Sequence, residues 1–383
     1  FPEMEIRQCG DMQEPMELLE LPGISLDYFL RGLAGEAYQD NTVFQELYSW
    51  YLQSPEYRIL VKKLTEASFS ERPSDKIGKT VAKILYGEIS PYSATRLERF
   101  AACAFAHFLQ YGLKVTERAE YEFRAMDMGN VMHMALEKFA AEVRKEGLDW
   151  AELTEEERNR IIDSCLDQVS ADYGNTILKS SARNEYMIER TRRILRRTVW
   201  ALQEQLKHGA FRPEGFEVRF QGGRIDRVDI MEEPENNRVY VKVIDYKTGN
   251  TSFDLLALYH GLQLQLMVYM NAACEEQRRK DQKCIVIPAG ILYYHIDDPL
   301  VASRSFQDFV GEQNDETAIL EQLAVDGLVV DDTEIIHHMD QHPEMPPKVL
   351  PVTLKKDGSL SALSSAAPPE NFEILSWHVK RRT

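Results

Sequence analysis

The sequence contains few cysteines and no long apolar segment. Its five cysteines are scattered over 383 residues without a Cys-x-x-Cys pair, which argues against the disulfide framework of a small secreted protein. No apolar run is long enough to span a bilayer, and no signal peptide is visible. We therefore expect a cytoplasmic protein with no membrane partner and two or three domains. Because the chain begins with Phe1 and not methionine, we also expect it to be a piece of a longer protein.

Positive charge is scarce as well. The formal net charge of −17 argues against DNA binding through bulk electrostatics, because DNA-binding domains are typically basic. A local arginine cluster in residues 189–197 could still neutralise several phosphates. The alternative is a solvated helix face that pairs with acidic neighbours such as Glu185 and Glu189. The cluster consists of Arg190, Arg192, Arg193, Arg196 and Arg197.

A phosphate-binding loop is also missing. The tripeptide Gly78-Lys-Thr80 looks like the end of such a loop, but the glycine required five places earlier is Pro73. The sequence therefore predicts no ATP site in this chain.

The most informative feature that is present is a pair of acidic strands. Residues 223–229 and 243–249 each have the pattern of a β-strand, with Asp226 in the first and Asp245 in the second. Lys247 follows Asp245 by two positions, so both side chains point to the same face of a strand. The spacing of 19 positions between the aspartates suits a strand, a turn and an antiparallel return. Two carboxylates and a lysine at one sheet edge indicate Mg²⁺-dependent phosphodiester cleavage; two strand-end ion pairs are the alternative.

A helix is predicted for residues 128–139, and it carries a histidine. His133 and Glu137 are four positions apart on one face, and Gly129 allows a close backbone approach one turn earlier. A lone histidine on a helix is more often structural than a metal ligand. The apolar face of this helix consists of Met132, Leu136 and Phe139.

A second helix is predicted around residues 259–269. Gln265 and Tyr269 are four positions apart on it, and they are either site residues or ordinary polar surface groups. The buried stripe of this helix is expected to consist of Leu262, Leu266 and Met270.

The order of these features resembles the RecB-type nuclease domain within the PD-(D/E)xK superfamily. In both, a helix with a histidine precedes a strand with an aspartate, an Asp-x-Lys strand and a Gln-x-x-x-Tyr helix. The resemblance covers about residues 88–383. The segments Ser93–Phe108 and Pro288–Pro299 narrow it to the nuclease domain of the B subunit (AddB, or RexB-like) of AddAB-type helicase–nucleases.

The resemblance implies an α/β (α+β) fold with a restriction-endonuclease-like core, in which helices flank a mixed sheet. Residues 88–383 would form the nuclease domain, cut short at its C-terminal end, and the α-rich residues 1–87 would be the remnant of a helicase-like domain. We expect helices at 25–35, 42–51, 56–67, 94–112, 128–146, 153–173, 181–208 and 255–274, with a break at 71–75. We expect strands at 216–220, 224–231, 239–246 and 285–296; residues from about 300 to 383 are not assigned.

The resemblance also implies a set of metal ligands. Asp226 and Asp245 would hold Mg²⁺ (or Mn²⁺), together with the His133 imidazole and the backbone carbonyl of Tyr246. A site of this kind, rich in hard oxygen ligands, suits Mg²⁺.

The remaining residues would support the chemistry. Lys247 would orient or activate the attacking water and offset the charge of the transition state. Gln265 and Tyr269 would position the phosphate or the lysine. Further supporting roles fall to Asp229 and Glu137 beside the site and to Arg227 at the DNA backbone.

An iron–sulfur cluster is expected for the family but not for this chain. In the family, the cysteine at the position of Cys103 joins three others to hold a four-iron, four-sulfur cluster. Those three would lie beyond Thr383, and Cys274 and Cys284 come too early to replace them. The link at residues 220–223 is a second departure, because the family usually has a longer hairpin there.

The implied function is a metal-dependent DNA exonuclease that digests the 5′-terminated strand during double-strand break resection and recombinational repair. Its partners would be DNA and the A subunit of the helicase–nuclease. One alternative is a stand-alone RecB-like or Cas4-like nuclease, against which the α-rich residues 1–87 and the segment Ser93–Phe108 argue. Another is a non-catalytic module that guides a single strand and docks the helicase partner. The joint presence of all the ligand-type residues argues against that alternative.

Overall fold

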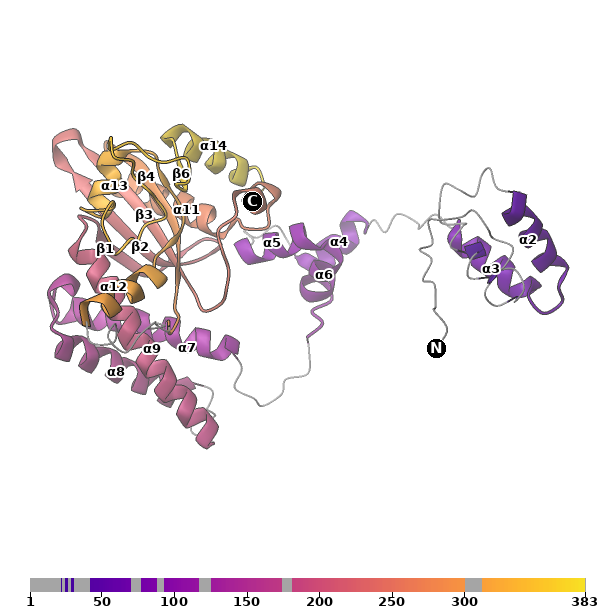
Figure 1. The fold of residues 1–383 in the computed structure, drawn as a ribbon, viewed down its shortest axis with the longest axis horizontal. Helices are drawn as coiled ribbons and strands as arrows, with labels where there is room; N and C mark the ends of the chain where they lie inside the picture. Colours follow the sequence, from indigo (N-terminus) through magenta and orange to yellow (C-terminus); the bar gives the residue numbers. More distant parts are fainter. Residues whose placement is uncertain are drawn as a thin grey trace, which may run out of the picture. The chain divides into compact units, whose positions relative to one another are not determined.

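The computed structural model describes residues 22, 25–26, 29–30, 42–69, 77–87, 93–116, 125–173, 181–299 and 312–382. The chain divides into two compact units between Lys79 and Thr80 (Figure 1). The sequence places the domain boundary slightly later, after residue 87. The expected break at residues 71–75 lies outside the described residues.

The first unit contains two helices with a small apolar core. The helices α2 (Thr42–Gln53) and α3 (Arg58–Ser68) correspond to those expected at 42–51 and 56–67. The helix expected at 25–35 is only partly described. The fully buried core residues are Phe29, Phe44, Tyr51 and Val61.

The second unit is built on a six-stranded mixed sheet whose spatial order follows the chain order (Figure 1). The pairs β1–β2, β2–β3 and β4–β5 are antiparallel, whereas β3–β4 and β5–β6 are parallel. The edge position of β1 is compatible with Pro213, because proline cannot donate a hydrogen bond to a neighbouring strand. The strands are β1 (Arg212–Phe220), β2 (Gly223–Glu233), β3 (Arg238–Lys247), β4 (Ile285–His295), β5 (Asp326–Val330) and β6 (Ala366–Ala367). The expected mixed sheet flanked by helices is confirmed.

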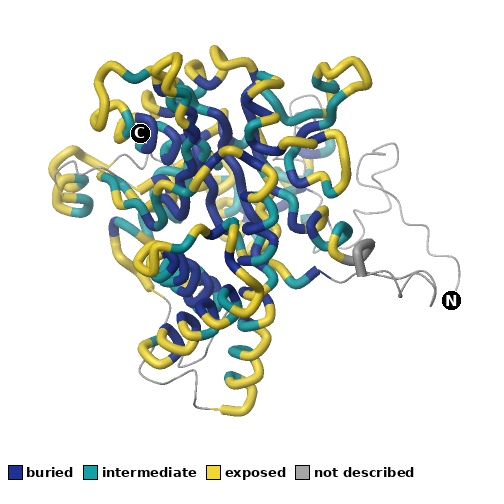
Figure 2. The backbone as a smooth tube through the Cα atoms, turned by 90° about the vertical axis from the view of Figure 1, so that its left-hand side faces the viewer, coloured by how far each residue is buried: buried dark blue, intermediate teal, exposed yellow. Residues whose placement is uncertain are grey.

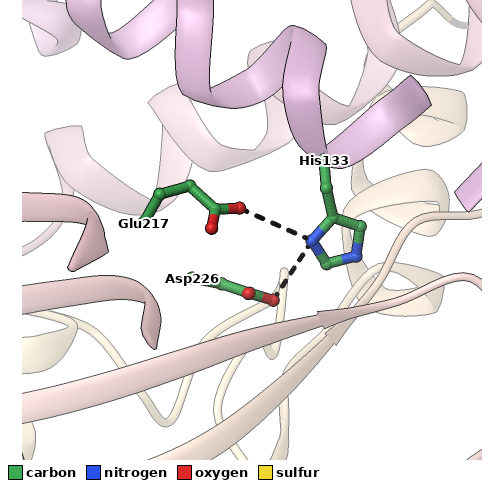
Figure 3. Close-up of side chains that lie close together, drawn as sticks. All are labelled: His133, Glu217 and Asp226. Carbon is green, nitrogen blue, oxygen red and sulfur yellow. Dashed lines mark ion pairs between the residues drawn. The ribbon is translucent and has the colours of Figure 1, made fainter. Parts of the chain in front are cut away.

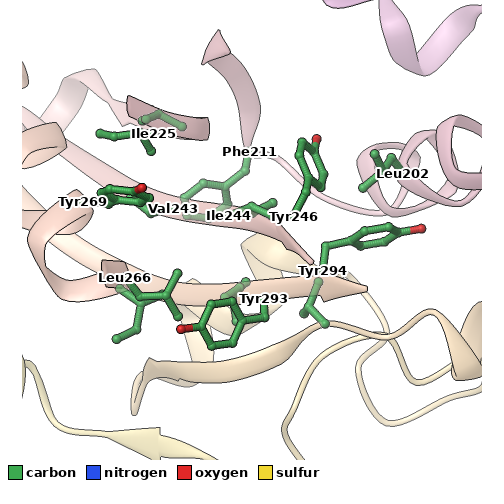
Figure 4. Packing of buried hydrophobic residues seen from close by; sticks show 14 of the residues in the cluster. Leu202, Phe211, Ile225, Val243, Ile244, Tyr246, Leu266, Tyr269, Tyr293 and Tyr294 are labelled. Atoms are coloured by element: carbon green, nitrogen blue, oxygen red, sulfur yellow. The ribbon is translucent and has the colours of Figure 1, made fainter. Parts of the chain in front are cut away.

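Helices cover both faces of this sheet. Leu266 and Tyr269 of α11 lie on one side of the central strands, and Leu202 of α9 lies on the other, beside Tyr246 and Tyr294 (Figure 4). The most deeply buried backbone runs between these helical layers (Figure 2). The helices are α4 (Lys79–Tyr86), α5 (Ala94–Ala102), α6 (Ala104–His107), α7 (Ala125–Lys145), α8 (Glu155–Asp172), α9 (Ala182–Lys207), α10 (Leu255–His260), α11 (Gln265–Lys280), α12 (Glu312–Gln322), α13 (Thr333–Met339) and α14 (Pro369–Lys380). No helix in the described part of the chain has the length and apolar character needed to cross a bilayer.

The helix expected at 94–112 is interrupted at Cys103. The backbone of Cys103 is extended, with φ −162° and ψ 106°, so α5 ends before this residue and α6 begins after it. A π-helical turn, Phe108–Gly112, follows α6.

The helix expected at 255–274 is also interrupted. Gly261 ends α10 with φ +82°, a conformation open to glycine but strained for other residues. The break turns Leu262 outward, so this residue is 43% exposed and not part of a buried stripe. Leu266 and Met270 are buried as expected.

Candidate metal and catalytic site

Three carboxylates lie side by side across the first three strands. The paired residues on either side of Glu217 put it level with Asp226 of β2. Continued by one residue beyond the pair Arg227–Ile244, the register puts Asp226 level with Asp245 of β3. All three residues are buried. Because like charges directly across a sheet repel each other, this row is stable only with protons or a cation beside it.

His133 also lies against this row, as do the cations Arg224 and Lys247, which pair with Glu217 and Asp245. Its Nδ1 lies 3.3 Å from Oδ2 of Asp226 and 3.9 Å from Oε1 of Glu217 (Figure 3). The histidine is carried by α7, whose apolar side is buried as predicted at Met132. An added Cβ on Gly129 would lie 3.0 Å from Oγ1 of Thr248, so glycine lets the first part of α7 approach the end of β3.

The pKa values of this group reflect the crowding of negative charge. Burial and the charge of Asp226 raise the pKa of Glu217 to about 7. Burial and Asp226 likewise raise the pKa of Asp245 to about 7, against the lowering effect of Lys247. Burial lowers the pKa of His133, but the hydrogen bond to Asp226 and the surrounding carboxylates outweigh it and raise this pKa overall. Protons on Glu217, Asp245 and His133 would therefore compete with a divalent cation for this site.

The backbone at Tyr246 also faces this group. Its N–H donates to Oδ2 of Asp226 at 2.8 Å, whereas the carbonyl of the next residue, Lys247, accepts from Ile296 on the other side of β3. Because N–H and C=O of one strand residue point to the same side, the Tyr246 carbonyl is directed towards β2. Its role as a backbone ligand stays a prediction.

Lys247 is held beside the carboxylate row by three neighbours. Its Nζ lies 2.6 Å from Oδ2 of Asp245 and donates to Oε1 of Gln265 at 2.8 Å. Nε2 of Gln265 in turn donates to the Tyr269 hydroxyl at 2.8 Å. The ammonium also lies 5.2 Å from the centre of the Tyr293 ring. The sequence led us to expect that Gln265 and Tyr269 position either the phosphate or the lysine. In the structure, Gln265 contacts the lysine and Tyr269 contacts Gln265.

The donor set fits a hard divalent cation. One ligand atom each from His133, Glu217 and Asp226 lie within 4.8 Å of one another, which is close enough for a shared ion. Carboxylate oxygens with one imidazole are ligands that Mg²⁺ and Mn²⁺ accept. Asp245 is not one of these three residues; its Oδ2 lies 2.6 Å from Nζ of Lys247 instead.

Glu217 was not among the residues expected from the sequence. It has φ +50°, a left-handed conformation that is uncommon for a residue other than glycine. Its carboxylate also pairs with Arg224 of β2. Its position could have been found by counting across the tight turn at 221–222, which places residue 217 opposite Asp226.

The arginine cluster on α9 lies mostly in ion pairs. Arg192 and Arg196 contact Asp163 of α8, and Arg193 and Arg197 contact Asp298 after β4. Arg192 also pairs with Asp167 and Glu189, and Arg190 is exposed. These contacts match the interpretation of a helix face paired with acidic neighbours, although the main partners are not those expected. DNA binding by the cluster stays a prediction.

The expected contact of Arg227 with DNA is wrong for this structure. The side chain is only 2% exposed and donates to Asp229 at 2.6 and 2.9 Å, below the ring of Trp150. Lys242 completes this buried ion group at 3.1 Å from Asp229. Asp229 therefore joins β2 to β3 and is not a neighbour of the carboxylate row. Glu137 does belong near the row, because its charge adds to burial and the charge of Asp226 in raising the pKa of Glu217.

Cys103 lies at the junction of α5 and α6 as an exposed free thiol. Its Sγ accepts a hydrogen bond from the Ala106 N–H at 3.5 Å. Cys274 is buried, and burial raises the pKa of its thiol to about 11. The iron–sulfur cluster that the resemblance implies at the position of Cys103 stays an expectation for the family and not for this chain.

Comparison with known proteins agrees with this geometry. The profile described as the PD-(D/E)XK nuclease superfamily matches residues 91–348. A protein of Lachnoclostridium phytofermentans, named as the B subunit of an ATP-dependent helicase/deoxyribonuclease, is 36% identical over 99% of this chain and 34% of its own length. Proteins of the same name from Alkaliphilus metalliredigens and Clostridium acetobutylicum are 36% and 33% identical, over 88% and 92% of this chain and 30% and 32% of their lengths. The chain thus spans about a third of the length of these curated relatives.

Proposed function

This chain belongs to the PD-(D/E)XK nuclease superfamily, and we propose on that basis that it is a Mg²⁺-dependent deoxyribonuclease. The observation that carries the proposal is the arrangement around Asp226. This carboxylate lies between the His133 imidazole and the Tyr246 N–H, opposite Asp245 and its partner Lys247. A structural ion pair would need neither the imidazole nor the third carboxylate.

The residues that would hold the cation are the side chains of His133, Glu217, Asp226 and Asp245, with the Tyr246 carbonyl. When bound, Mg²⁺ (or Mn²⁺) lowers the pKa of a coordinated water and polarises a phosphate oxygen. Displacement of protons from Glu217 and Asp245 makes both carboxylates available as anionic ligands.

Lys247 has a separate task. Its side chain is 23% exposed, and Gln265 and Asp245 fix the position of the ammonium. In that place it orients the attacking water and offsets the negative charge that builds up on the phosphate in the transition state. Tyr269 accepts a hydrogen bond from Gln265 and acts on the lysine through it.

We further propose that the chain acts as the nuclease part of the B subunit of a helicase–nuclease. The names of the relatives, each a B subunit of a helicase/deoxyribonuclease, support this assignment, with an A subunit as the partner and a DNA end as the substrate. Exonuclease action on the 5′-terminated strand, a role in break resection and recombinational repair, and a cytoplasmic location belong to the same proposal.

The proposal is tested by incubating the protein with end-labelled duplex and single-stranded DNA, with Mg²⁺ or with EDTA. We expect cleavage with Mg²⁺ and none with EDTA. Lys247→Ala should lower the cleavage rate by about a hundredfold or more, because a preorganised charge at the transition state is lost. Affinity for DNA, measured by fluorescence anisotropy, should change little.

The matched control is Lys355→Ala, which removes an exposed lysine from a loop outside the site. It should cut DNA at the original rate. A Lys247→Ala protein that degrades linear DNA as fast as the unchanged protein overturns the assignment. DNA binding without any metal-dependent cleavage would favour the non-catalytic guiding module, and labels on the 5′ and 3′ ends report the polarity.

A further inference from the structure

The helix that carries Gln265 lacks a capping side chain of its own. The residue before α11 is Leu264, which offers no hydrogen-bond acceptor, and the first turn contains no acidic residue. The first N–H groups of a helix have no partner within the helix, so they need an acceptor from elsewhere. In α10 and α13, by contrast, Asp254 and Asp332 accept these hydrogen bonds.

Glu98 of α5 supplies the missing acceptor. Its Oε1 accepts the N–H of Gln265 at 2.9 Å, across 167 positions of sequence. Burial raises the pKa of Glu98, while the N–H groups of Gln265 and Leu264 and the charge of Lys247 act in the opposite direction. The carboxylate also interacts favourably with the positive end of the helix dipole.

The break at Gly261 allows α5 to reach this position. A Cβ built on Gly261 would lie 3.5 Å from Cβ of Ala101, so α5 packs against the turn between α10 and α11. Ala101 and Glu98 lie three positions apart on α5 and therefore on the same face. The segment Ser93–Phe108 thus has a structural contact with the site, although it contributes no group to the carboxylate row.

We propose that Glu98 is a positioning residue for the catalytic lysine. It fixes the first residue of α11, Gln265, whose side chain in turn holds the Lys247 ammonium at 2.8 Å. The inference rests on the proposed nuclease function. Glu98 would act like the residues that hold metal ligands in place by hydrogen bonds. Loss of such a supporting hydrogen bond typically lowers activity about 10- to 100-fold.

The test compares Glu98→Ala with Glu98→Gln in the full chain. Glu98→Ala removes the acceptor, so kcat for DNA cleavage should fall about 10- to 100-fold while KM changes less than about threefold. Glu98→Gln keeps an oxygen that accepts the Gln265 N–H, so it should recover most of the activity. Mn²⁺ affinity, measured by calorimetry, should stay unchanged in both variants, because Glu98 contacts no carboxylate of the row.

Two further variants separate positioning from general damage. Asp332→Ala removes a comparable helix cap from α13 and should lower the melting temperature without changing kcat. In a double-mutant cycle with Gln265→Ala, the effect of Glu98→Ala should almost vanish, because its route to Lys247 is already cut. Amide hydrogen exchange at Gln265, which does not depend on catalysis, should become faster in Glu98→Ala.

Each result bears on one proposal. Unchanged kcat and unchanged exchange at Gln265 in Glu98→Ala would overturn the inference while leaving the nuclease intact. Full additivity with Gln265→Ala would also overturn it. If the unchanged protein cuts no DNA with Mg²⁺ or Mn²⁺, the proposed function itself has failed.

Discussion

Asp226 occupies the centre of the site because of where its strand neighbours lie. Glu217 and Asp245 face it from the two adjacent strands, and His133 approaches from α7. Without a cation, Glu217 and Asp245 bind protons more tightly in the folded chain than in the unfolded one, because their pKa values are raised. The stability of the metal-free protein is therefore linked to pH through these residues.

We expect metal-free protein to melt at a lower temperature at pH 8.5 than at pH 5.5. The folded pKa of about 7 at Glu217 and Asp245 exceeds the ordinary carboxyl value. Protonation therefore stabilises the fold fully below about pH 4, and this contribution is lost as the pH rises through about 7. The raised pKa of His133 acts in the same direction. A difference of roughly 5 °C or more should be visible by circular dichroism in EDTA.

Mg²⁺ should raise the melting temperature more at pH 8.5 than at pH 5.5, because it replaces the lost protons. The control is Glu217→Gln, which removes one raised pKa and should flatten the pH profile. Equal melting temperatures at both pH values, or a profile unaffected by Glu217→Gln, would contradict this account.

At the scale of elements, the site is formed where a helix, a hairpin and a crossover meet. The β1–β2–β3 meander aligns the carboxylates, and α11, in the crossover from β3 to β4, brings Gln265 to Lys247. The first part of α7 passes close to the end of β3 at Gly129 and Thr248, one turn before His133. The distance between α7 and the sheet therefore controls the position of the imidazole.

Gly129→Ala should impair cleavage without unfolding the protein. The added Cβ would lie 3.0 Å from Oγ1 of Thr248, so α7 must shift by a few tenths of an ångström. Alanine also favours the helix by about 1 kcal/mol relative to glycine, which offsets the crowding. We expect an approximately tenfold lower cleavage rate and weaker Mn²⁺ binding by calorimetry, because small displacements of catalytic groups are costly.

The compensating variant is Gly129→Ala combined with Thr248→Ala. It removes the atom that the new Cβ would meet, so it should recover the original rate. If the single variant cuts DNA normally, or if the double variant recovers nothing, then the approach of α7 does not determine the position of His133.

At the scale of the whole molecule, the chain consists of two units with separate cores. The core of the first unit contains Phe29, Phe44, Tyr51 and Val61, and the carboxylate row lies entirely in the second. The metal-binding residues can therefore stabilise only one of the two units directly.

Differential scanning calorimetry should accordingly show two unfolding transitions. Addition of Mg²⁺ should raise the temperature of the larger transition, which belongs to residues 80–383, and leave the smaller one in place. Asp226→Ala serves as the control, because it should abolish the shift. A single transition that moves as a whole with Mg²⁺ would show that the two units unfold together.

The sequence alone was sufficient for the features that follow from local periodicity. The i, i+2 spacing predicts that Asp245 and Lys247 share a face of β3, and they form an ion pair. The i, i+4 spacing of Gln265 and Tyr269 likewise predicts a contact, and their side chains are hydrogen-bonded. Such relations depend only on the repeat of a strand or a helix.

Features that depend on which elements pack together were decided only by the tertiary structure. Glu217 enters the site through the register of β1, and Glu98 reaches α11 across 167 positions of sequence. Arg227 has the residue type of a DNA contact, but Trp150 and Asp229 enclose it in the interior. Burial and partner identity arise from contacts between distant segments, and a charged side chain has the same appearance in the sequence whether it faces DNA, a metal or another side chain.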